Sequence, residues 1–574
     1  MDAILQTLTQ ADSTVLNVYQ AILRYLVPIL VLFLFLRVSV PLLTFRREPE
    51  IWGWLVYPDG TRLPITHWES VIGRSRRSDI VLREPTVSRN HAVLTRYDDG
   101  SWTISDAGSK AGVLVNGEAV EISPLEPEDT LQLGGVELKL LPITRRQEQK
   151  LQQLRTRAAT ALDMLSALAL LTALQIVVAV AYLMNAQSGD SGCILAGFGG
   201  LLALEWLLAA FYLLIRKPSF EVETIAFFLC TMGMCSICSV SPDSASKELL
   251  AIALGLALFL FLGWSVRELD RAKRMRYFAA VAGIGLLAVT LLFGKEYYGA
   301  KNWLSIGGFS IQPSELSKVC FVFVGASTMD RIMSRRNLIL FIVYTVLVCA
   351  CLALMNDFGT ALIFFVAFLL IAFLRSGSVG TIALACTALG FAGVLALRLA
   401  PHALRRFTAW RHIWDDPLDT GYQQTRALMC IASGGLFGLG AGNGWMQNLF
   451  AADSDVVFAT ISEEWGLLVA IACVLFIVVL GLFSLRTANM GRSSFFVIGS
   501  CTAAGILLVQ TMFNVLGTLD VLPLTGVTFP FVSNGGSSMI CCWGLLAFIK
   551  AGDTRQDASF AVRRTKEGRP DGNE

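Results

Sequence analysis

Long apolar stretches separated by short basic segments make up most of the chain, whereas one region near the N-terminus alternates apolar and polar residues. The apolar run from Val18 to Leu43 is long enough to cross a hydrocarbon core of about 30 Å, and Arg46 and Arg47 follow it directly. Because it lacks a preceding basic segment and a following small-residue cleavage site, we interpret it as a retained anchor rather than a signal peptide. We therefore expect residues 1–47 to form a transmembrane anchor whose N-terminus lies outside.

Residues 48–142 have the pattern of a soluble β domain. Short alternating strands, such as the one from Trp52 to Tyr57, are separated by turn-forming pairs such as Asn116-Gly117. This pattern predicts a small antiparallel β-sandwich. A polar linker over residues 143–161 follows, and its basic side chains suit the anionic cytoplasmic leaflet of a membrane. These side chains are Arg145, Arg146, Lys150, Arg155 and Arg157.

Beyond Leu162 nearly all of the sequence consists of membrane-length apolar runs, and the short basic loops between them set the orientation. Placing these loops inside predicts about twelve further helices, and hence about thirteen in all. Residues 162–216 are then an additional transmembrane hairpin, and both the β domain and a tail over residues 552–574 are cytoplasmic. The basic loops comprise Arg216 and Lys217, residues 267–276, residues 331–336, Arg375 and residues 486–492.

Composition narrows the class of protein further. Hydrophobic residues make up 54% of the 574 residues and charged residues 16%, against about 25% charged in soluble domains. Together with the mean hydropathy of +0.60, these values exclude a single soluble globule and predict a polytopic α-helical membrane protein. The net charge of +2 gives no indication of nucleic-acid binding. The thirteen cysteines lie mostly inside apolar runs, which indicates neither a disulfide framework nor a zinc site.

The β domain carries a series of spaced short motifs that resembles the forkhead-associated (FHA) domain pattern. In that family, loops at one end of the sandwich hold a phosphothreonine, which implies phosphate contacts from Arg74, Ser88 and Arg89. His91 is expected to be a buried residue that organises the loops. The motifs are Gly73-Arg74-Ser75, Ser78-Asp79-Ile80, Ser88-Arg-Asn-His91, Asp106, Ser109, Gly112 and Val115-Asn-Gly117.

One family position in this domain differs from the usual pattern. Ala111 stands where the family usually has Asn, so a contact to the peptide backbone is missing. Two interpretations therefore stay open. The domain either binds a phosphothreonine-containing protein of a Ser/Thr kinase pathway, or it keeps the sandwich and has lost the ligand.

Polar residues gather in four clusters that the basic loops place on the outer side. Ionisable groups at a membrane are costly unless they line a cavity or take part in chemistry, so these clusters are the candidate functional residues. The clusters are 299–304 with Gln312, Ser314, Glu315 and Lys318; 356–360; 421–464 with Gly434, Gly435, Gly438, Gly440, Asp453, Asp455, Glu463 and Glu464; and Thr525, Gly526, Pro530 and 533–538.

In the same order, these clusters resemble the shape, elongation, division and sporulation (SEDS) family of FtsW and RodA type. The resemblance covers residues 217–551 and implies a ten-span core that polymerises lipid II into glycan strands at the outer face of a bacterial cytoplasmic membrane. It also implies a separate partner, a monofunctional class B penicillin-binding transpeptidase. A role in elongation, division or sporulation is equally compatible with the pattern.

The chemistry of glycan extension requires a group that takes a proton from the attacking hydroxyl, which is general-base catalysis. The resemblance gives this role to Asp455, which lies between Ser454 and the apolar residues 456–458. Partial desolvation there would raise the basicity of the carboxylate. The alternative is that Asp455 only caps the helix that follows it.

Positive charge is needed where the lipid diphosphate leaves, and Arg405, Arg406 and Arg411 lie in the same long loop as Asp455. The alternative is that Arg405 and Arg406 contact anionic lipid headgroups. A divalent cation, Mg²⁺ or Mn²⁺, held by phosphate oxygens and one carboxylate could share this task. No motif in the sequence specifies a metal site, however.

The remaining polar residues allow a structural and a substrate-binding interpretation. Glu315 and Lys318 are three residues apart, so they share a helical face and can form either a buried ion pair or part of a substrate cavity. Ser314 is expected to cap the helix beginning near Glu315. Asp357 is interpreted as a helix-end residue, and the Gly-Gly-Ser-Ser run over 535–538 as a helix N-terminus or packing site.

Two functions of different classes remain. The first is a membrane glycosyltransferase regulated through a cytoplasmic phosphothreonine reader. The second is a non-enzymatic lipid II transporter or division scaffold. A transporter needs charged groups along a path through the bilayer, whereas the sequence places its carboxylates on the outer side, which favours the enzyme.

Overall fold

The structure of the chain is a computed structural model. It describes residues 13–45, 51–76, 78–97, 100–144, 147, 159–186, 190–267, 269–297, 300–306, 309–329, 335–376, 379–380, 383, 386–387, 390, 404, 407–408, 410–488, 493–555 and 558. The basic side chains predicted for the linker, from Arg145 to Arg157, and nearly all of the tail lie outside these residues.

The described helices form a membrane body, which confirms the predicted polytopic α-helical fold. Ten of them are long and apolar enough to cross a membrane. They are α2 (Ser13–Thr44), α4 (Ala161–Met184), α5 (Ser191–Leu214), α6 (Glu221–Val240), α7 (Ala245–Ser265), α8 (Leu269–Phe293), α10 (Arg335–Leu354), α11 (Phe358–Ser376), α16 (Leu467–Ala488) and α17 (Ser494–Thr518).

Two shorter helices complete the bundle, α9 (Pro313–Met329) and α18 (Gly536–Ala551). A further span expected between Arg375 and about residue 399 lies mostly outside the described residues.

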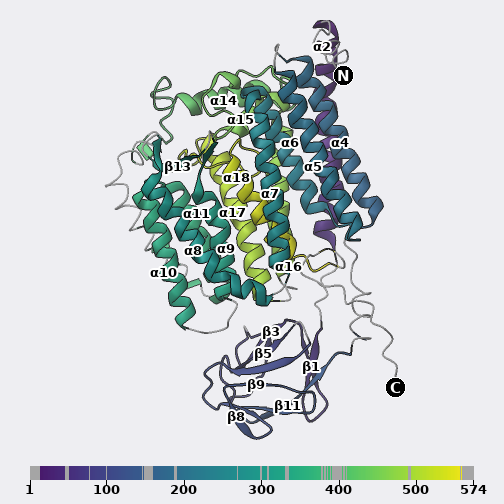
Figure 1. Cartoon of the computed structure of the whole chain (residues 1–574), viewed down its shortest axis with the longest axis vertical. Coiled ribbons are helices and arrows are strands. Elements are labelled where there is room, and N and C mark those ends of the chain that lie inside the picture. Colours follow the sequence, from purple (N-terminus) through teal and green to yellow (C-terminus); the bar gives the residue numbers. More distant parts are fainter. Residues whose placement is uncertain are drawn as a thin grey trace.

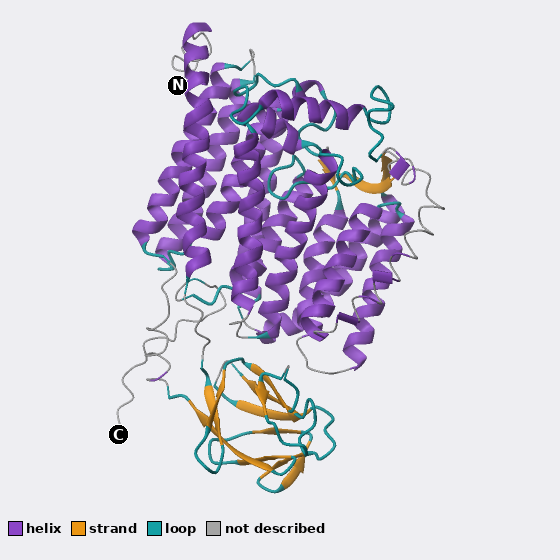
Figure 2. Ribbon diagram, turned by 180° about the vertical axis from the view of Figure 1, so that it is seen from behind, coloured by secondary structure: helices purple, strands orange, loops and turns teal. Residues whose placement is uncertain are grey.

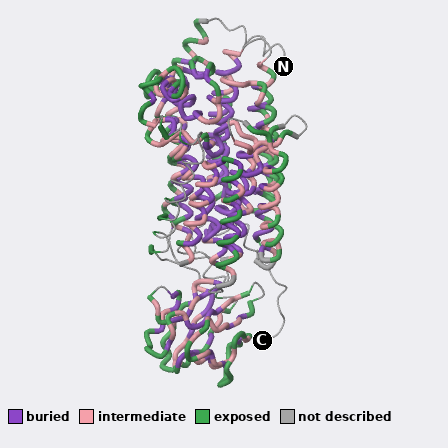
Figure 3. The backbone as a smooth tube through the Cα atoms, turned by 90° about the vertical axis from the view of Figure 1, so that its left-hand side faces the viewer, coloured by how far each residue is buried: buried purple, intermediate pink, exposed green. Residues whose placement is uncertain are grey.

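The helices divide into central and peripheral ones. The apolar window of α6 is 94% buried and that of α8 only 17%, so α6 lies in the interior while α8 faces the surroundings. Buried residues gather inside the helical body and exposed ones along its outside (Figure 3).

Residues 53–142 form the predicted β-sandwich of two sheets. One sheet has the order β2-β1-β11-β10-β7-β8 and the other β4-β3-β5-β6-β9. One pair departs from the antiparallel prediction, because β3 and β4 run parallel. The strands are β1 (Gly53–Val56), β2 (Arg62–Ile65), β3 (Glu69–Gly73), β4 (Ile80–Val81), β5 (Ala92–Arg96), β6 (Trp102–Asp106), β7 (Val113–Val115), β8 (Glu118–Val120), β9 (Ile122–Pro124), β10 (Thr130–Leu133) and β11 (Val136–Pro142).

The sandwich lies at one end of the helical body (Figures 1 and 2). We call this end of the body the sandwich end and the opposite one the far end. Trp68, in the turn before β3, packs edge-on against Phe496 at the start of α17, with 6.4 Å between ring centroids. The sandwich is therefore in contact with the helical body through α17.

The far end is built from loops and short elements (Figure 1). A small antiparallel sheet precedes α9, and two short α-helices and a 3₁₀ helix lie in the described part of the long segment before α16. These elements are β12 (Lys295–Tyr297), β13 (Ala300–Ile306), β14 (Phe309–Ile311), α14 (Tyr422–Gly434), the 3₁₀ helix η2 (Met446–Asn448) and α15 (Val457–Trp465).

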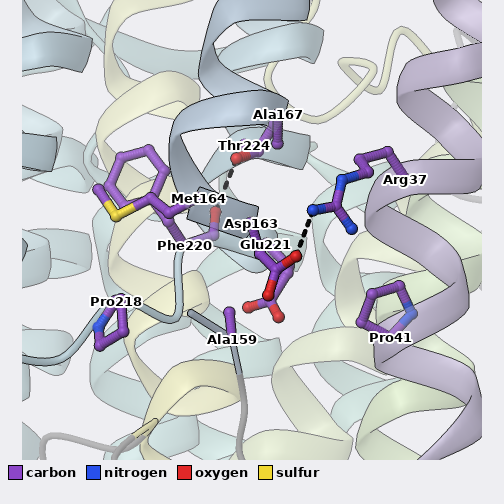
Figure 4. A pocket seen from close by; sticks show the side chains of 10 residues that line it. All are labelled: Arg37, Pro41, Ala159, Asp163, Met164, Ala167, Pro218, Phe220, Glu221 and Thr224. Carbon is purple, nitrogen blue, oxygen red and sulfur yellow. Dashed lines mark hydrogen bonds and ion pairs between the residues drawn. The ribbon is translucent and has the colours of Figure 1, made fainter. Parts of the chain in front are cut away.

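Helices α2 and α4 flank the sandwich in sequence and pack against each other. Near the sandwich end Arg37 of α2 forms an ion pair with Asp163 of α4 (Figure 4). Thr160 and Asp163 form a capping box that fixes the start of α4. The ion pair borders a pocket of about 150 Å³ between α2, α4 and the start of α6. The two helices are thus joined where the chain enters and leaves the sandwich.

Candidate active site and phosphopeptide site

The segment before α15 is held by hydrogen bonds from three other parts of the far end. Asn514 of α17 donates to the carbonyl oxygen of Asp455 at 3.0 Å, and Ser533 donates to that of Ser454 at 2.6 Å. Thr460 donates to the carbonyl oxygen of Ala452 at 2.7 Å. The backbone around Asp455 is therefore fixed, and the N-cap position of α15 is Val456 rather than Asp455.

Asp453 is the second carboxylate of this segment, and hydroxyl and amide groups hold it. Its Oδ2 accepts hydrogen bonds from Ser241 Oγ and Asn534 Nδ2, each at 2.7 Å. The Asn534 N–H also donates to the Asp453 carbonyl oxygen at 2.8 Å. The third and fourth polar clusters of the sequence thus meet in space, although Asp453 and Asn534 are 81 residues apart.

Glycines allow the loop after α14 to pack directly on the C-terminal half of α15. The N–H groups of Leu439 and Gly440 donate to the carbonyl oxygens of Glu463 and Glu464 at 2.8 and 2.9 Å. Gly438 has a φ of +81°, and a Cβ there would lie 2.2 Å from the Glu464 carbonyl oxygen. A larger residue would therefore separate the loop from α15.

Glu463 fixes the same loop through its side chain. Its carboxylate accepts hydrogen bonds from the N–H groups of Trp445 and Met446 at 3.0 and 2.9 Å, at the start of η2. Glu463 is 1% exposed. It is therefore a loop-fixing group, and no solvent-facing role follows from its position.

Asp357 joins three elements of the far end. It accepts from Asn302 of β13 and from Gln312, each at 3.1 Å, and from the N–H of Thr360 in the first turn of α11 at 3.2 Å. The helix-end position predicted for Asp357 is confirmed. The first and second polar clusters of the sequence are therefore adjacent.

Glu315 and Lys318 form the ion pair that their spacing allows, with 2.7 Å between Lys318 Nζ and Glu315 Oε2. Both side chains are buried, at 5% and 1% exposure. The capping role expected for Ser314 is wrong, because α9 begins at Pro313 and places Ser314 inside its first turn. The run over 535–538 does start a helix, since α18 begins at Gly536.

Of the three arginines proposed to hold the diphosphate, Arg405 and Arg406 lie outside the described residues. Arg411 lies at the far end, exposed, with its guanidinium 5.2 Å from the ring centroid of Trp410. Its N–H donates to Asp520 at 3.1 Å, in the loop after α17. This bond holds the backbone of Arg411 and does not involve its guanidinium.

The described residues include no group of three or more His, Cys, Asp or Glu side chains that could hold a metal ion. No chemical step below relies on one.

In the sandwich, the three residues implied for phosphate binding lie on adjoining loops. The N–H of Arg74 donates to the Ser88 carbonyl oxygen at 3.0 Å, and the N–H of Ser75 donates to that of Arg89 at 3.0 Å. Arg74 and Arg89 are exposed. The close approach requires Gly73, since a Cβ there would lie 2.3 Å from the Arg89 carbonyl oxygen.

His91 holds these loops together through hydrogen bonds of its buried ring, as predicted. It is fully buried, with Nδ1 accepting from the Ser88 N–H at 3.0 Å and Nε2 lying 2.9 Å from the Gly112 carbonyl oxygen. Ser88 Oγ accepts from the Lys110 N–H at 3.0 Å, so its own proton is available for an acceptor such as phosphate. Ala111, next to Lys110, is exposed.

Sequence reasoning missed several residues that this geometry brings forward. Ser241 and Asn514 contact the Asp453–Asp455 segment, and Lys110 supplies an exposed cation beside Ser88. Ser241 directly follows α6, Asn514 lies inside the apolar helix α17, and Lys110 follows the motif residue Ser109. A polar residue at such a position indicates a hydrogen bond, but the sequence does not show which residue it contacts.

Carboxylates also occur at the sandwich end, which corrects the expectation that they collect on one side. Glu223 pairs with Lys550 at 3.1 Å, and Arg555 pairs with Glu221 and Asp553 at 3.0 and 2.8 Å. All five are buried. These groups form closed ion pairs and therefore do not line an open path through the helices.

Comparison with known proteins places both parts of the chain. Residues 222–556 match the family model of the cell cycle proteins of FtsW, RodA and SpoVE type, and residues 70–134 match that of the FHA domain. The peptidoglycan glycosyltransferase RodA of Mycobacterium tuberculosis (strain ATCC 25618 / H37Rv) is 30% identical over 328 residues, which are 53% of this chain and 69% of that protein.

Two further matches agree with this assignment. A probable peptidoglycan glycosyltransferase FtsW of Tolumonas auensis is 32% identical over 374 residues, covering 61% of this chain and 97% of that protein. One similar solved structure comes from a study of the structural coordination of polymerisation and crosslinking by a peptidoglycan synthase complex. The matched chain is 26% identical with a TM-score of 0.50, and the match covers 57% of this chain and 96% of that one. The chain therefore belongs to the FtsW, RodA and SpoVE family of cell cycle proteins and carries an FHA domain before the family core.

Proposed function

We propose that this chain is a peptidoglycan glycosyltransferase that polymerises lipid II, with Asp455 as the general base. The observation that carries the proposal is the Asp453–Asp455 segment, which α17 and the loop before α18 hold in one backbone conformation. A catalytic carboxylate must be positioned to within a fraction of an ångström, and such a fixed segment meets that requirement.

In the proposed reaction, the hydroxyl of one sugar attacks the anomeric carbon of another. Asp455 takes the hydroxyl proton as the new C–O bond forms, while the bond to the lipid diphosphate breaks and its electron pair leaves with the diphosphate. Arg411, with Arg405 and Arg406, is proposed to stabilise the negative charge that develops on the leaving group. The exposed guanidinium of Arg411 at the far end supports this role.

The orientation belongs to the same proposal. The far end is taken to face the outside of a bacterial cytoplasmic membrane, and the sandwich, the Arg555 region and the tail to face the cytoplasm. The basic loops next to the sandwich end support it. A cysteine-labelling map should then modify position 415 from outside and position 74 only after permeabilisation.

The sandwich is proposed to bind a phosphothreonine-containing protein of a Ser/Thr kinase pathway through Arg74, Ser88 and Arg89. Two exposed cations beside a hydroxyl whose proton is available suit a group with about two negative charges and three acceptor oxygens. The exposed Ala111 supplies no amide for the peptide backbone, so the affinity is expected to be low.

A separate penicillin-binding transpeptidase is proposed as the partner that crosslinks the strands. The test of the proposed function is polymerisation of lipid II by the purified chain, alone and with such a transpeptidase. Glycan polymer formed by the pair would support the enzyme. Lipid II binding without polymer in either sample would favour a transporter or scaffold, and would overturn the proposal.

A further inference from the structure

Three of the helices that the structure describes precede the family core, and two of them reach the loops around Asp455. Helices α2, α4 and α5 lie outside residues 222–556. Helix α2 packs against α16, and α4 packs against α6. Both α2 and α4 cross the whole body, from the sandwich end to the far end (Figure 1).

The far end of α2 contacts the loop that follows α14. Arg24 Nε donates to the Gly438 carbonyl oxygen at 2.7 Å, and Gln20 Nε2 donates to that of Ala441 at 3.4 Å. The rings of Tyr25 and Phe437 lie 5.1 Å apart. Arg24 lies in a membrane-length helix, and the carbonyl it binds belongs to the loop after α14. Because an unpaired guanidinium or carbonyl group is costly in a membrane, this hydrogen bond fixes the position of the loop.

The far end of α4 contacts α15 itself. Tyr182 Oη donates to Glu464 Oε2 at 2.6 Å and accepts from Trp465 Nε1 at 3.2 Å. Asn185 Nδ2 donates to the Ala441 carbonyl oxygen at 3.1 Å, so α4 also contacts the loop that α2 holds. Tyr182, Glu464 and Trp465 are all buried.

Helix α15 connects these contacts to the reacting segment. It begins two residues after Asp455 and ends at Trp465, and every residue in it is buried. A buried helix of this length is rigid, so the position of Glu464 is transmitted to the residues that precede Val457. The loop holding Gly438 is bonded to the same end of α15.

We propose that α2 and α4 position the catalytic segment, with Tyr182 and Arg24 as positioning residues for Asp455. The inference rests on the proposed function. The two helices form one unit, because the Arg37–Asp163 ion pair and a hydrogen bond from Tyr19 Oη to the Val177 carbonyl oxygen at 2.8 Å join them along their length. The N-terminal addition is thus part of the active-site scaffold as well as the carrier of the sandwich.

The chain contains a matched control for Tyr182. Tyr212 of α5 is also buried, and its Oη donates to Glu223 Oε1 at 2.6 Å at the sandwich end. Tyr182→Phe and Tyr212→Phe therefore each remove a tyrosine-to-glutamate hydrogen bond, at opposite ends of the body, and Tyr182→Phe also removes the acceptor of Trp465 Nε1. Loss of stability should be similar in the two variants, whereas loss of positioning should occur in one.

The experiment compares both variants with the wild type in polymerisation of lipid II. Misplacement of a catalytic group can cost up to about a hundredfold in rate, and we expect roughly tenfold lower kcat with unchanged KM for Tyr182→Phe. Tyr212→Phe should keep the wild-type kcat. Arg24→Gln should also lower kcat, and Arg24→Lys, which keeps a cationic donor, should recover part of it.

Hydrogen exchange over residues 438–456 gives a second readout that needs no activity. Exchange should rise in Tyr182→Phe and stay at the wild-type level in Tyr212→Phe. Equal kcat in the two variants, or unchanged exchange in Tyr182→Phe, would overturn the positioning role. If the wild-type chain makes no polymer, the proposed function fails, and the exchange comparison still decides whether α4 holds the loop.

Discussion

Most of the buried carboxylates at the two ends of the helical body have different partners, although Glu315 at the far end is paired with a cation, Lys318. At the sandwich end, Glu223 faces Lys550 at 3.1 Å, and Arg555 lies between Glu221 and Asp553. At the far end, the described contacts of Asp453, Glu463 and Glu464 come from hydroxyl, amide and backbone N–H groups. These donors include Ser241, Asn534, Trp445, Met446, Ser239 and Tyr182.

The difference separates a structural cluster from a chemical one. A carboxylate paired with a buried cation has its charge balanced, and its role is to hold helices together. A carboxylate held by neutral donors is fixed in place without a cation opposite it, which suits a site that must accept protons. The proposed function accordingly places the chemistry at the far end, in the Asp453–Asp455 segment, while the ion pairs at the sandwich end hold helices together.

The largest effect on stability is expected at the sandwich end. Lys550→Met removes the cation facing Glu223 and should lower the free energy of unfolding by about 3–5 kcal/mol, because an unpaired charge is left buried. Thermal unfolding in detergent measures this loss. The double variant Lys550→Met with Glu223→Gln should recover most of it, and a single variant as stable as the wild type would contradict the ion-pair interpretation.

At the far end, a similar change should affect rate rather than stability. Asn534→Ala removes the amide that donates to Asp453, and a hydrogen bond to a charged group contributes about 1.5–3 kcal/mol, so we expect at least a roughly tenfold lower polymerisation rate. Asn448→Ala is the control, since Asn448 is exposed and donates only locally to the Trp445 carbonyl oxygen. Equal polymerisation rates in the two variants would show that the bond from Asn534 to Asp453 does not contribute to the reaction.

The exposed cations of the sandwich should behave unlike the buried Arg555. Arg74→Ala should weaken binding of a phosphothreonine peptide to the full-length chain by about tenfold, since one charge-assisted bond is lost, without changing the unfolding temperature. Arg83→Ala, which alters another exposed arginine of the sandwich, is the control. Fluorescence polarisation measures the affinity, and no preference for the phosphorylated peptide would indicate that the domain only keeps the fold.

The smallest effect is expected for an exposed ion pair at the far end. His412 Nδ1 and Asp415 Oδ2 lie 2.9 Å apart, with side-chain exposures of 68% and 76%. Asp415→Asn should therefore change stability by less than about 1 kcal/mol. A larger loss would show that exposure is a poor guide to the value of these pairs in this chain.

The parts of the structure that depend on local sequence could be predicted, and those that depend on distant partners could not. The run from Val18 to Leu43 predicts α2, and the resemblance to the FHA pattern implies a buried His91 that organises the loops. In contrast, the bonded pairs Tyr182–Glu464 and Lys550–Glu223 join residues that are 282 and 327 positions apart in the sequence, so no local pattern predicts them. Apolar periodicity shows that a helix is buried but not which helix covers it.

The candidate site follows the same rule. The order of the polar motifs indicates Asp455 and its family, because motif order is a property of the sequence. The hydrogen bonds from Ser241, Asn514 and Asn534 to the Asp453–Asp455 segment depend on how α6, α17 and the loop before α18 meet. These contacts depend on how distant helices pack, so the local sequence around each residue does not predict them.

Polymerisation of lipid II by the purified Asp455→Asn variant tests the central claim most directly, with Asp415→Asn as the control at the same end. The substitution removes the proton acceptor and keeps the shape, so we predict a loss on the order of a hundredfold or more in rate, with lipid II binding nearly unchanged. Asp415→Asn should polymerise at the wild-type rate. A stably folded Asp455→Asn protein with near-normal polymer yield would contradict the assignment of the chemistry to Asp455.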